Sequence, residues 1–194
     1  MNRKGFSTIS IIILCMIAFL IVNAQSKIDD KESARIFVQN FYNWYGKLDM
    51  ANVNGDKNPN PYGLTLSHKP AYLDNRLLKA LMEDQKAGEE STDGINGLDF
   101  DPFTNAQDVR TGYQTGLVSQ KGDKFFVDVH DITSGQSTQA ILKADLVATV
   151  EVAKVNGHWV FMNILYPKAD RGYNLLEILE YQKKERAKWA KEKS

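Results

Sequence analysis

The sequence has almost no cysteine and little histidine. Among its 194 residues there are one Cys and three His. The single cysteine, Cys15, lies inside an apolar N-terminal run that we expect to be removed on export. The mature chain would then hold no thiol, which excludes disulfides, cysteine nucleophiles and cysteine-ligated metals. So few histidines also leave no His-rich metal pattern.

The chain also lacks a net charge of either sign. Lys and Arg together number 24, and so do Asp and Glu. Loss of the N-terminal run would remove Arg3 and Lys4, which leaves 22 basic residues against 24 acidic ones and a net charge of −2. Since nucleic-acid binding needs a positive surface, we predict no nucleic-acid partner.

The N-terminal segment has the pattern of a secretory signal peptide over residues 1–24. Arg3 and Lys4 precede an uncharged run of 14 residues, and Ala24 supplies a small side chain before Gln25. We therefore predict export to the periplasm or the extracellular space, with cleavage between Ala24 and Gln25. The run is short for a spanning helix of about 20 residues. The alternative is an uncleaved segment that anchors the protein in the inner membrane, and this segment would be the only membrane contact.

A hairpin over residues 144–166 organises the predicted fold. Apolar and polar residues alternate from 144 to 155, which predicts an antiparallel strand with one buried face. Asn156 and Gly157 tolerate positive φ and predict a tight turn. The segment after the turn is apolar on both of its faces, so we expect a strand in the centre of the sheet. Two shorter strands, over 113–119 and 125–131, are predicted to precede the hairpin.

Three helices are predicted around this sheet. Aromatic residues at helical spacing between 30 and 45 predict a helix whose aromatic face packs on the sheet or lines a ligand pocket. Asp74 is expected to cap a short helix, and Asn174 to cap a C-terminal one that becomes solvent-facing or frayed after 183. The stretch 52–70, rich in Asn, Gly and Pro, indicates a surface loop.

A short stretch after the second helix gathers oxygen-bearing side chains. Its members are Asp99, Asp101, Asn105, Gln107 and Asp108. We predict a ligand-binding site here, for a small polar ligand, a partner protein or calcium, because hard cations bind several oxygens gathered in this way. The stretch is not an EF-hand, since Pro102 interrupts the acidic alternation and no Glu closes the loop. The alternative is that the aspartates shape turns and accept hydrogen bonds from the backbone N–H groups after Pro102.

Asp128 and His130 form the other candidate pair. In a strand they would be neighbours on one sheet face, which is the minimum for an acid/base pair. This pair is the weak catalytic candidate for a small-molecule hydrolase or isomerase. The alternative is a solvated pair at the rim of the sheet, since no third residue that would orient the histidine is evident.

The order of these elements resembles the nuclear transport factor 2-like α+β cone. The segments Phe41–Tyr45, Tyr72–Leu81, Asp99–Asp108 and Trp159–Tyr166 are similar to those of the bacterial exported family called domain of unknown function 3828. The resemblance covers about residues 33–179 of a single domain over 25–194. It implies a curved mixed or antiparallel sheet wrapped by N-terminal helices, with a C-terminal helix. It also implies a concave mouth that related folds use for small ligands, partner chains or acid/base catalysis, but no particular activity.

The sequence therefore predicts an exported, non-enzymatic binding module for an unknown small ligand or protein partner. Its site would be the mouth of the cone and the acidic loop over 99–108. No cofactor is predicted apart from the calcium considered for that loop. A homodimer that pairs through its sheet is a further interpretation.

We expect the exported protein to begin at Gln25, because a small residue at Ala24 suits signal peptidase. N-terminal sequencing of the protein from its host checks this expectation. An intact Met1 terminus that stays in the membrane fraction after carbonate washing would establish the anchored form instead.

Overall fold

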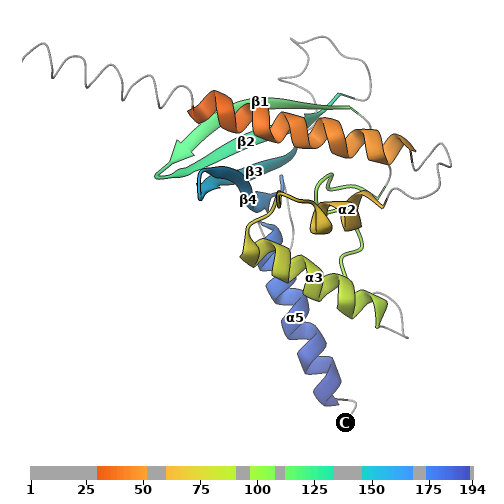
Figure 1. Cartoon of the computed structure of the whole chain (residues 1–194). Coiled ribbons are helices and arrows are strands. Elements are labelled where there is room, and N and C mark those ends of the chain that lie inside the picture. Colours follow the sequence, from red (N-terminus) through yellow and green to blue (C-terminus); the bar gives the residue numbers. More distant parts are fainter. Residues whose placement is uncertain are drawn as a thin grey trace, which may run out of the picture. The chain divides into compact units, whose positions relative to one another are not determined.

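The computed structural model describes residues 30–51, 60–90, 97–107, 112–132, 146–167 and 174–192. These residues form four helices and a four-stranded antiparallel sheet (Figure 1), so the predicted α+β class is confirmed at this coarse level. The predicted cleavage site at Ala24 and Gln25 lies outside the described residues, as does Asp108. Within the described ranges, no helix combines the length and apolar character needed to cross a membrane.

The sheet consists of consecutive antiparallel strands. They are β1 (Tyr113–Lys121), β2 (Lys124–Asp131), β3 (Leu146–Val155) and β4 (His158–Leu165), in the order β1-β2-β3-β4. The predicted turn between β3 and β4 is confirmed, with φ of 52° at Asn156 and 80° at Gly157. Phe125, Val127 and Val129 of β2 are buried, as the alternation in the sequence predicts.

The prediction that β4 lies in the centre of the sheet is wrong. β4 is the last strand in the order, and the segment before α3 runs along its outer edge. Phe161 N donates to Tyr72 O at 2.8 Å, and Asp74 N donates to Phe161 O at 3.0 Å. The apolar composition of β4 therefore reflects burial of both of its faces. A strand at the end of a sheet can be as apolar as a central strand when other segments cover it.

A register shift changes the faces of β4. Val152 pairs with Phe161 and Val150 pairs with Ile164, so β4 has one extra residue in this interval. Phe161 and Ile164 consequently lie on the same face, and both are fully buried. A strict period of two would have placed them on opposite faces, because it does not anticipate a bulge.

The helix over residues 30–51 packs its aromatic face against the sheet (Figure 1). Phe41, Tyr42 and Tyr45 are at most 1% exposed. The ring of Phe41 lies 4.7 Å from that of Phe161, between centroids. The aromatic stripe is therefore mainly core, and the helix continues one and a half turns beyond the end predicted at about Tyr45.

A short helix, α2 (Pro61–Ser67), lies in the stretch that we predicted to be a surface loop. Gly63 N donates to the Asn60 side-chain oxygen at 2.9 Å, and Pro61 occupies the first helical turn. Asn followed by Pro is the usual start of a helix, because Asn caps free N–H groups and Pro needs none. The part of the predicted loop over 52–59 lies outside the described residues.

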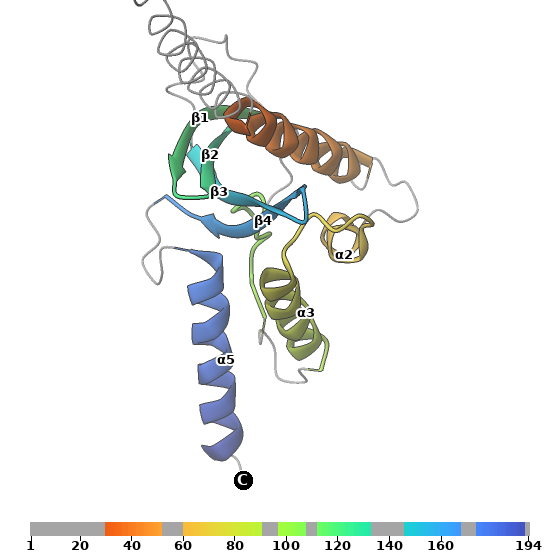
Figure 2. The ribbon, with the colours of Figure 1, turned by 60° about the vertical axis from the view of Figure 1, so that its left-hand side comes forward.

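The two remaining helices begin at the predicted caps. α3 (Asn75–Glu89) has Leu77 N donating to Asp74 Oδ1 at 2.8 Å. α5 (Leu175–Glu192) has Glu177 N donating to Asn174 Oδ1 at 3.1 Å. The two helices lie side by side (Figures 1 and 2). The last turns of α5 are mostly exposed, as predicted, but they stay helical as far as Glu192.

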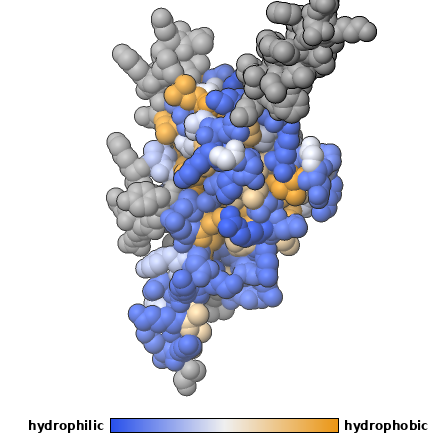
Figure 3. Space-filling model, turned by 90° about the vertical axis from the view of Figure 1, so that its left-hand side faces the viewer, coloured by the Kyte–Doolittle hydropathy of each residue, from blue (hydrophilic) through white to orange (hydrophobic). Residues whose placement is uncertain are grey.

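The surface carries no extended apolar region on the coloured part of the face in Figure 3. Hydrophilic residues predominate there, and apolar residues form separate small patches. Single exposed apolar side chains of this kind are normal for a folded domain. The described surface on this side therefore gives no independent support to a dimer.

Phe161 connects the sheet to the helix over 30–51 through two aromatic contacts, and it is fully buried. We expect Phe161→Ala to lower the free energy of unfolding by roughly 3–5 kcal/mol, the usual loss for a buried Phe. Urea denaturation measures this change.

Trp189→Ala is the matched control, because Trp189 is 58% exposed. Its effect should stay within about 0.5 kcal/mol. Equal unfolding midpoints for Phe161→Ala and the unmodified chain would show that this core is misassigned.

Candidate functional site

The loop over 97–107 contains a closed turn that begins at Asp101. Asp101 N donates to Ala106 O and Asn105 N donates to Asp101 O, both at 2.9 Å. Asn105 has a φ of 49°, a left-handed conformation that Asn adopts more readily than most residues. The predicted acidic stretch is therefore a compact turn.

The carboxylate of Asp101 is satisfied from within the protein. Its Oδ1 accepts hydrogen bonds from Phe103 N at 2.8 Å and from Thr104 N at 3.0 Å. Its Oδ2 accepts a short hydrogen bond from the Tyr45 hydroxyl. These backbone donors follow Pro102, so Asp101 has the structural role that the sequence left as the alternative.

Two more tyrosines attach the turn to the core through backbone carbonyls. The Tyr42 hydroxyl donates to Phe103 O and the Tyr166 hydroxyl donates to Pro102 O, each at 2.7 Å. The Phe103 side chain is fully buried. Three hydroxyl groups and one ring thus hold the turn in a single position.

The other predicted ligand residues do not converge on Asp101. Asp99, Asn105 and Gln107 are exposed. Gln107 Nε2 donates to the backbone oxygen of Asp99 at 3.2 Å, and Asn105 Nδ2 lies 3.5 Å from Val147 O. Asp108 is outside the described residues. Within the part of the chain that the structure describes, no group of three or more His, Cys, Asp or Glu side chains is placed to hold a metal ion.

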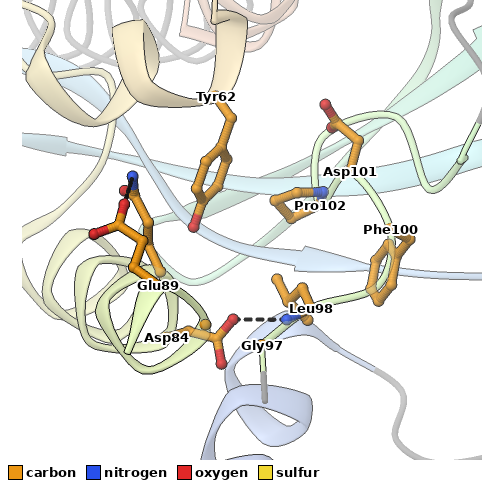
Figure 4. Close-up of a pocket in the computed structure, with 10 residues that line it drawn as sticks. Tyr62, Asp84, Glu89, Gly97, Leu98, Phe100, Asp101 and Pro102 are labelled. Carbon is orange, nitrogen blue, oxygen red and sulfur yellow. Dashed lines mark hydrogen bonds between the residues drawn. The ribbon is translucent and has the colours of Figure 1, made fainter. Parts of the chain in front are cut away.

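A cavity of about 420 Å³ adjoins this loop (Figure 4). The described residues of its lining come from α2, from α3 and from 97–102. The lining residues are Tyr62, Asp84, Gln85, Gly88, Glu89, Gly97, Leu98, Phe100, Asp101 and Pro102. Among the predicted site residues that the structure describes, Asp101 alone reaches this cavity.

The carboxylate of Asp84 connects α3 to α5 and to the loop over 97–107. The residue is only 2% exposed. Its Oδ1 accepts from Arg186 Nη1 of α5 at 2.6 Å, and its Oδ2 accepts from Leu98 N at 2.8 Å. A buried carboxylate needs such partners, because an unpaired one is strongly destabilising.

Two glycines bring α3 and the loop close together beside Asp84. A Cβ at Gly97 would lie 3.3 Å from Asp84 Oδ2, which leaves little room for a side chain. A Cβ at Gly88 would meet nothing closer than 3.9 Å, an ordinary van der Waals distance. A Cβ is therefore accommodated at Gly88, on the wall of the cavity beside Gly97.

Aromatic rings line the wall of the cavity that faces α3. The Tyr62 side chain extends from α2 toward the space between α3 and the loop in Figure 4, and its hydroxyl donates to Leu81 O at 3.2 Å. Phe100 packs edge-on against Tyr166, with 5.6 Å between ring centroids. The Asp101 carboxylate points away from the labelled side chains of α3 in the same view. Asp101 therefore contributes mainly its backbone to the cavity wall.

A second carboxylate, that of Asp49, lies close enough to Asp101 to interact with its charge. Asp49 follows Tyr45 by one helical turn and is 8% exposed. Burial and the negative charge of Asp101 raise the pKa of Asp49 to about 7. Burial also raises the pKa of Asp101, while the hydrogen bonds from Tyr45, Phe103 and Thr104 oppose that rise. Burial and Asp101 raise the pKa of Tyr45 in turn, so its hydroxyl stays protonated as a donor.

Asp128 and His130 lie apart from this cavity. Both are half-buried, on the face of β2 opposite Val127 and Val129. Asp128 Oδ1 accepts a hydrogen bond from Thr149 Oγ1 at 2.7 Å. The imidazole of His130 lies against the neighbouring strand, where a Cβ at Gly116 would be 2.7 Å from Nε2.

Sequence reasoning missed the residues that α2 and α3 bring to the cavity. One signal was available for Asp84, because Leu77, Leu81 and Asp84 recur at steps of four and three. That spacing places a carboxylate on the buried face of a helix, where it needs a partner. No comparable local signal marks Tyr62 or Glu89, whose place depends on how the helices pack.

We expect Asp49→Asn to change the dependence of stability on pH. The folded-state pKa of Asp49, about 7, is above its ordinary value of 3.8, so the folded state binds this proton more tightly. The stabilisation is complete below about pH 4 and is lost as pH rises toward about 7. Since Asn is neutral throughout, the variant should be more stable than the unmodified chain above about pH 7, with a flatter profile below it.

Thermal melting at a series of pH values measures both profiles. Asp99→Asn serves as the control, because Asp99 is exposed and lies outside this cluster. Identical pH profiles for the unmodified chain and Asp49→Asn would contradict the assignment.

Comparison with models of protein families, with curated proteins and with solved structures found no match to this chain. The resemblance to the domain of unknown function 3828 therefore stays a prediction.

Proposed function

We propose that the protein is an exported, non-enzymatic binding module of the nuclear transport factor 2-like type. Its ligand site, in this proposal, is the cavity between α2, α3 and residues 97–102. The observation that carries the proposal is the cavity itself, walled by two aromatic rings and by buried or anchored polar groups. Export is supported by the signal-like segment over 1–24.

The size and the lining of the cavity suit a small molecule. Ligand pockets in proteins typically measure about 300–1,000 Å³ and combine apolar walls with a few fixed polar groups. This cavity, at about 420 Å³, has apolar surface from Leu98, Phe100 and Pro102, and polar groups from α3. The cavity lies beside the predicted acidic loop, which forms part of its wall. The Asp101 carboxylate of that loop points away from the labelled side chains of α3.

The walls are also held in place before any ligand binds. Asp84 joins α3, α5 and Leu98, while Tyr42, Tyr45 and Tyr166 fix the turn that begins at Asp101. A preformed site binds more tightly than one that has to be ordered, because less conformational entropy is lost on binding. This rigidity supports a binding role for the cavity.

The alternative, a hydrolase or isomerase that uses Asp128 and His130, has weaker support. Neither residue lines the cavity. Asp128 already accepts a hydrogen bond from Thr149, and His130 lies against Gly116. The pair and the cavity therefore do not combine into one catalytic site, and we favour the binding module.

Filling the cavity from Gly88 tests the proposal on residues 25–194. A library of small fragments is screened by ligand-detected NMR against the unmodified domain and against Gly88→Leu. The added side chain should occupy the cavity, so fragments that bind the unmodified domain should lose binding. A Cβ fits at this position, and Leu is the better helix former by about 1 kcal/mol. Thermal melting of Gly88→Leu establishes that the variant is folded before its binding is compared.

Lys79→Leu is the matched control, since it adds the same side chain to α3 at a position that is 79% exposed and outside the cavity. It should keep the fragments that the unmodified domain binds. If Gly88→Leu binds the same fragments, or if no fragment binds the unmodified domain, the cavity is not the ligand site.

A further inference from the structure

Three hydrogen-bond donors on the cavity wall are engaged within the protein. The Tyr62 hydroxyl donates to Leu81 O at 3.2 Å, and Leu98 N donates to Asp84 at 2.8 Å. Gln85 Nε2 donates to Glu89 Oε1 at 2.9 Å. These bonds direct the donor hydrogens toward protein oxygens. The hydroxyl and carboxylate oxygens keep lone pairs, so the wall offers mainly acceptors.

The charged side chains of the cavity wall favour a positively charged ligand. Asp84 and Glu89 both line the cavity, whereas no Lys, Arg or His is among the described residues that line it. Arg186 compensates Asp84 from the α5 side. Glu89 adds a negative charge at the exposed end of the cavity. A bound anion would face these carboxylates, while a cation would be attracted to them.

The aromatic rings of the cavity wall also suit a positively charged ligand. Tyr62 and Phe100 stand on the wall that faces α3, together with Leu98 and Pro102 (Figure 4). An aromatic face attracts a cation through its quadrupole, and it also packs against a flat or aliphatic body. The cavity therefore combines a surface for an apolar body with acceptors for a charged donor.

We propose that this cavity binds a small organic cation, namely a protonated amine on an apolar body. The ammonium group lies toward α3, where the oxygens of Asp84 and Glu89 are, and the apolar body lies between Tyr62 and Phe100. This assignment rests on the proposed function and names the ligand class of the same site. It is independent of the acidic turn, because the Asp101 carboxylate is already satisfied by three protein donors.

Three probes of one shape test the assignment: phenethylammonium, phenethyl alcohol and phenylpropionate. They share a benzene ring on a short chain and differ in carrying a positive charge, no charge or a negative charge. Titration calorimetry and ligand-detected NMR with residues 25–194 measure their binding. We expect phenethylammonium to bind at least about fivefold more tightly than the alcohol, because a charged donor strengthens each hydrogen bond to a carboxylate. Phenylpropionate should bind least.

Two variants locate the binding and the charge effect. Glu89→Gln removes an exposed charge and should weaken phenethylammonium by about two- to fivefold, while it leaves the alcohol unchanged. Gly88→Leu should abolish binding of both. Asp84 is left unaltered, since its loss would uncouple α3, α5 and Leu98 and could unfold the domain.

The outcomes separate this inference from the proposed function. If the alcohol binds as tightly as the ammonium, and Gly88→Leu abolishes both, the cavity is a ligand site but the preference for a cation is wrong. A preference for phenylpropionate would overturn the inference in the same way. If Gly88→Leu affects none of the probes, or none binds, the cavity assignment itself fails.

Discussion

One half-buried carboxylate, that of Asp101, fixes the loop on which the candidate site depends. Its two oxygens accept hydrogen bonds from two backbone N–H groups and from the Tyr45 hydroxyl. A buried carboxylate without such donors would destabilise the fold, so turn and helix hold each other in place. The wall of the cavity formed by Asp101 and Pro102 follows from this arrangement.

Asp84 has the corresponding role on the other side of the cavity. It binds Arg186 from α5 and the backbone of Leu98, and it is almost completely buried. Both aspartates are therefore connectors between elements. The space between the parts that they join, lined by Tyr62, Gly88 and Phe100, is what remains for a ligand.

Features with a local cause could be predicted from the sequence. The turn at Asn156 and Gly157, and the helix caps at Asp74 and Asn174, depend on a few neighbouring residues, and the structure confirms each of them. The start of α2 at Asn60 and Pro61 had an equally local signal, which the many turn residues around it concealed.

Features with a non-local cause could not be predicted in this way. The position of β4 at the end of the sheet depends on the segment at Tyr72, which is distant in sequence. The extra residue in β4 changes the faces without changing the composition. The cavity likewise arises from the packing of α3 against the loop, so its lining could not be read from any single segment.

Native mass spectrometry of the protein exported by its own host would examine the cavity without any chosen probe. Protein recovered under mild conditions should carry a bound small molecule that is released on denaturation and contains a basic nitrogen. Gly88→Leu from the same host should lack this molecule, while Lys79→Leu should retain it. An unmodified protein whose mass equals that of the chain alone, or an adduct that Gly88→Leu retains, would contradict the assignment of the cavity as the binding site.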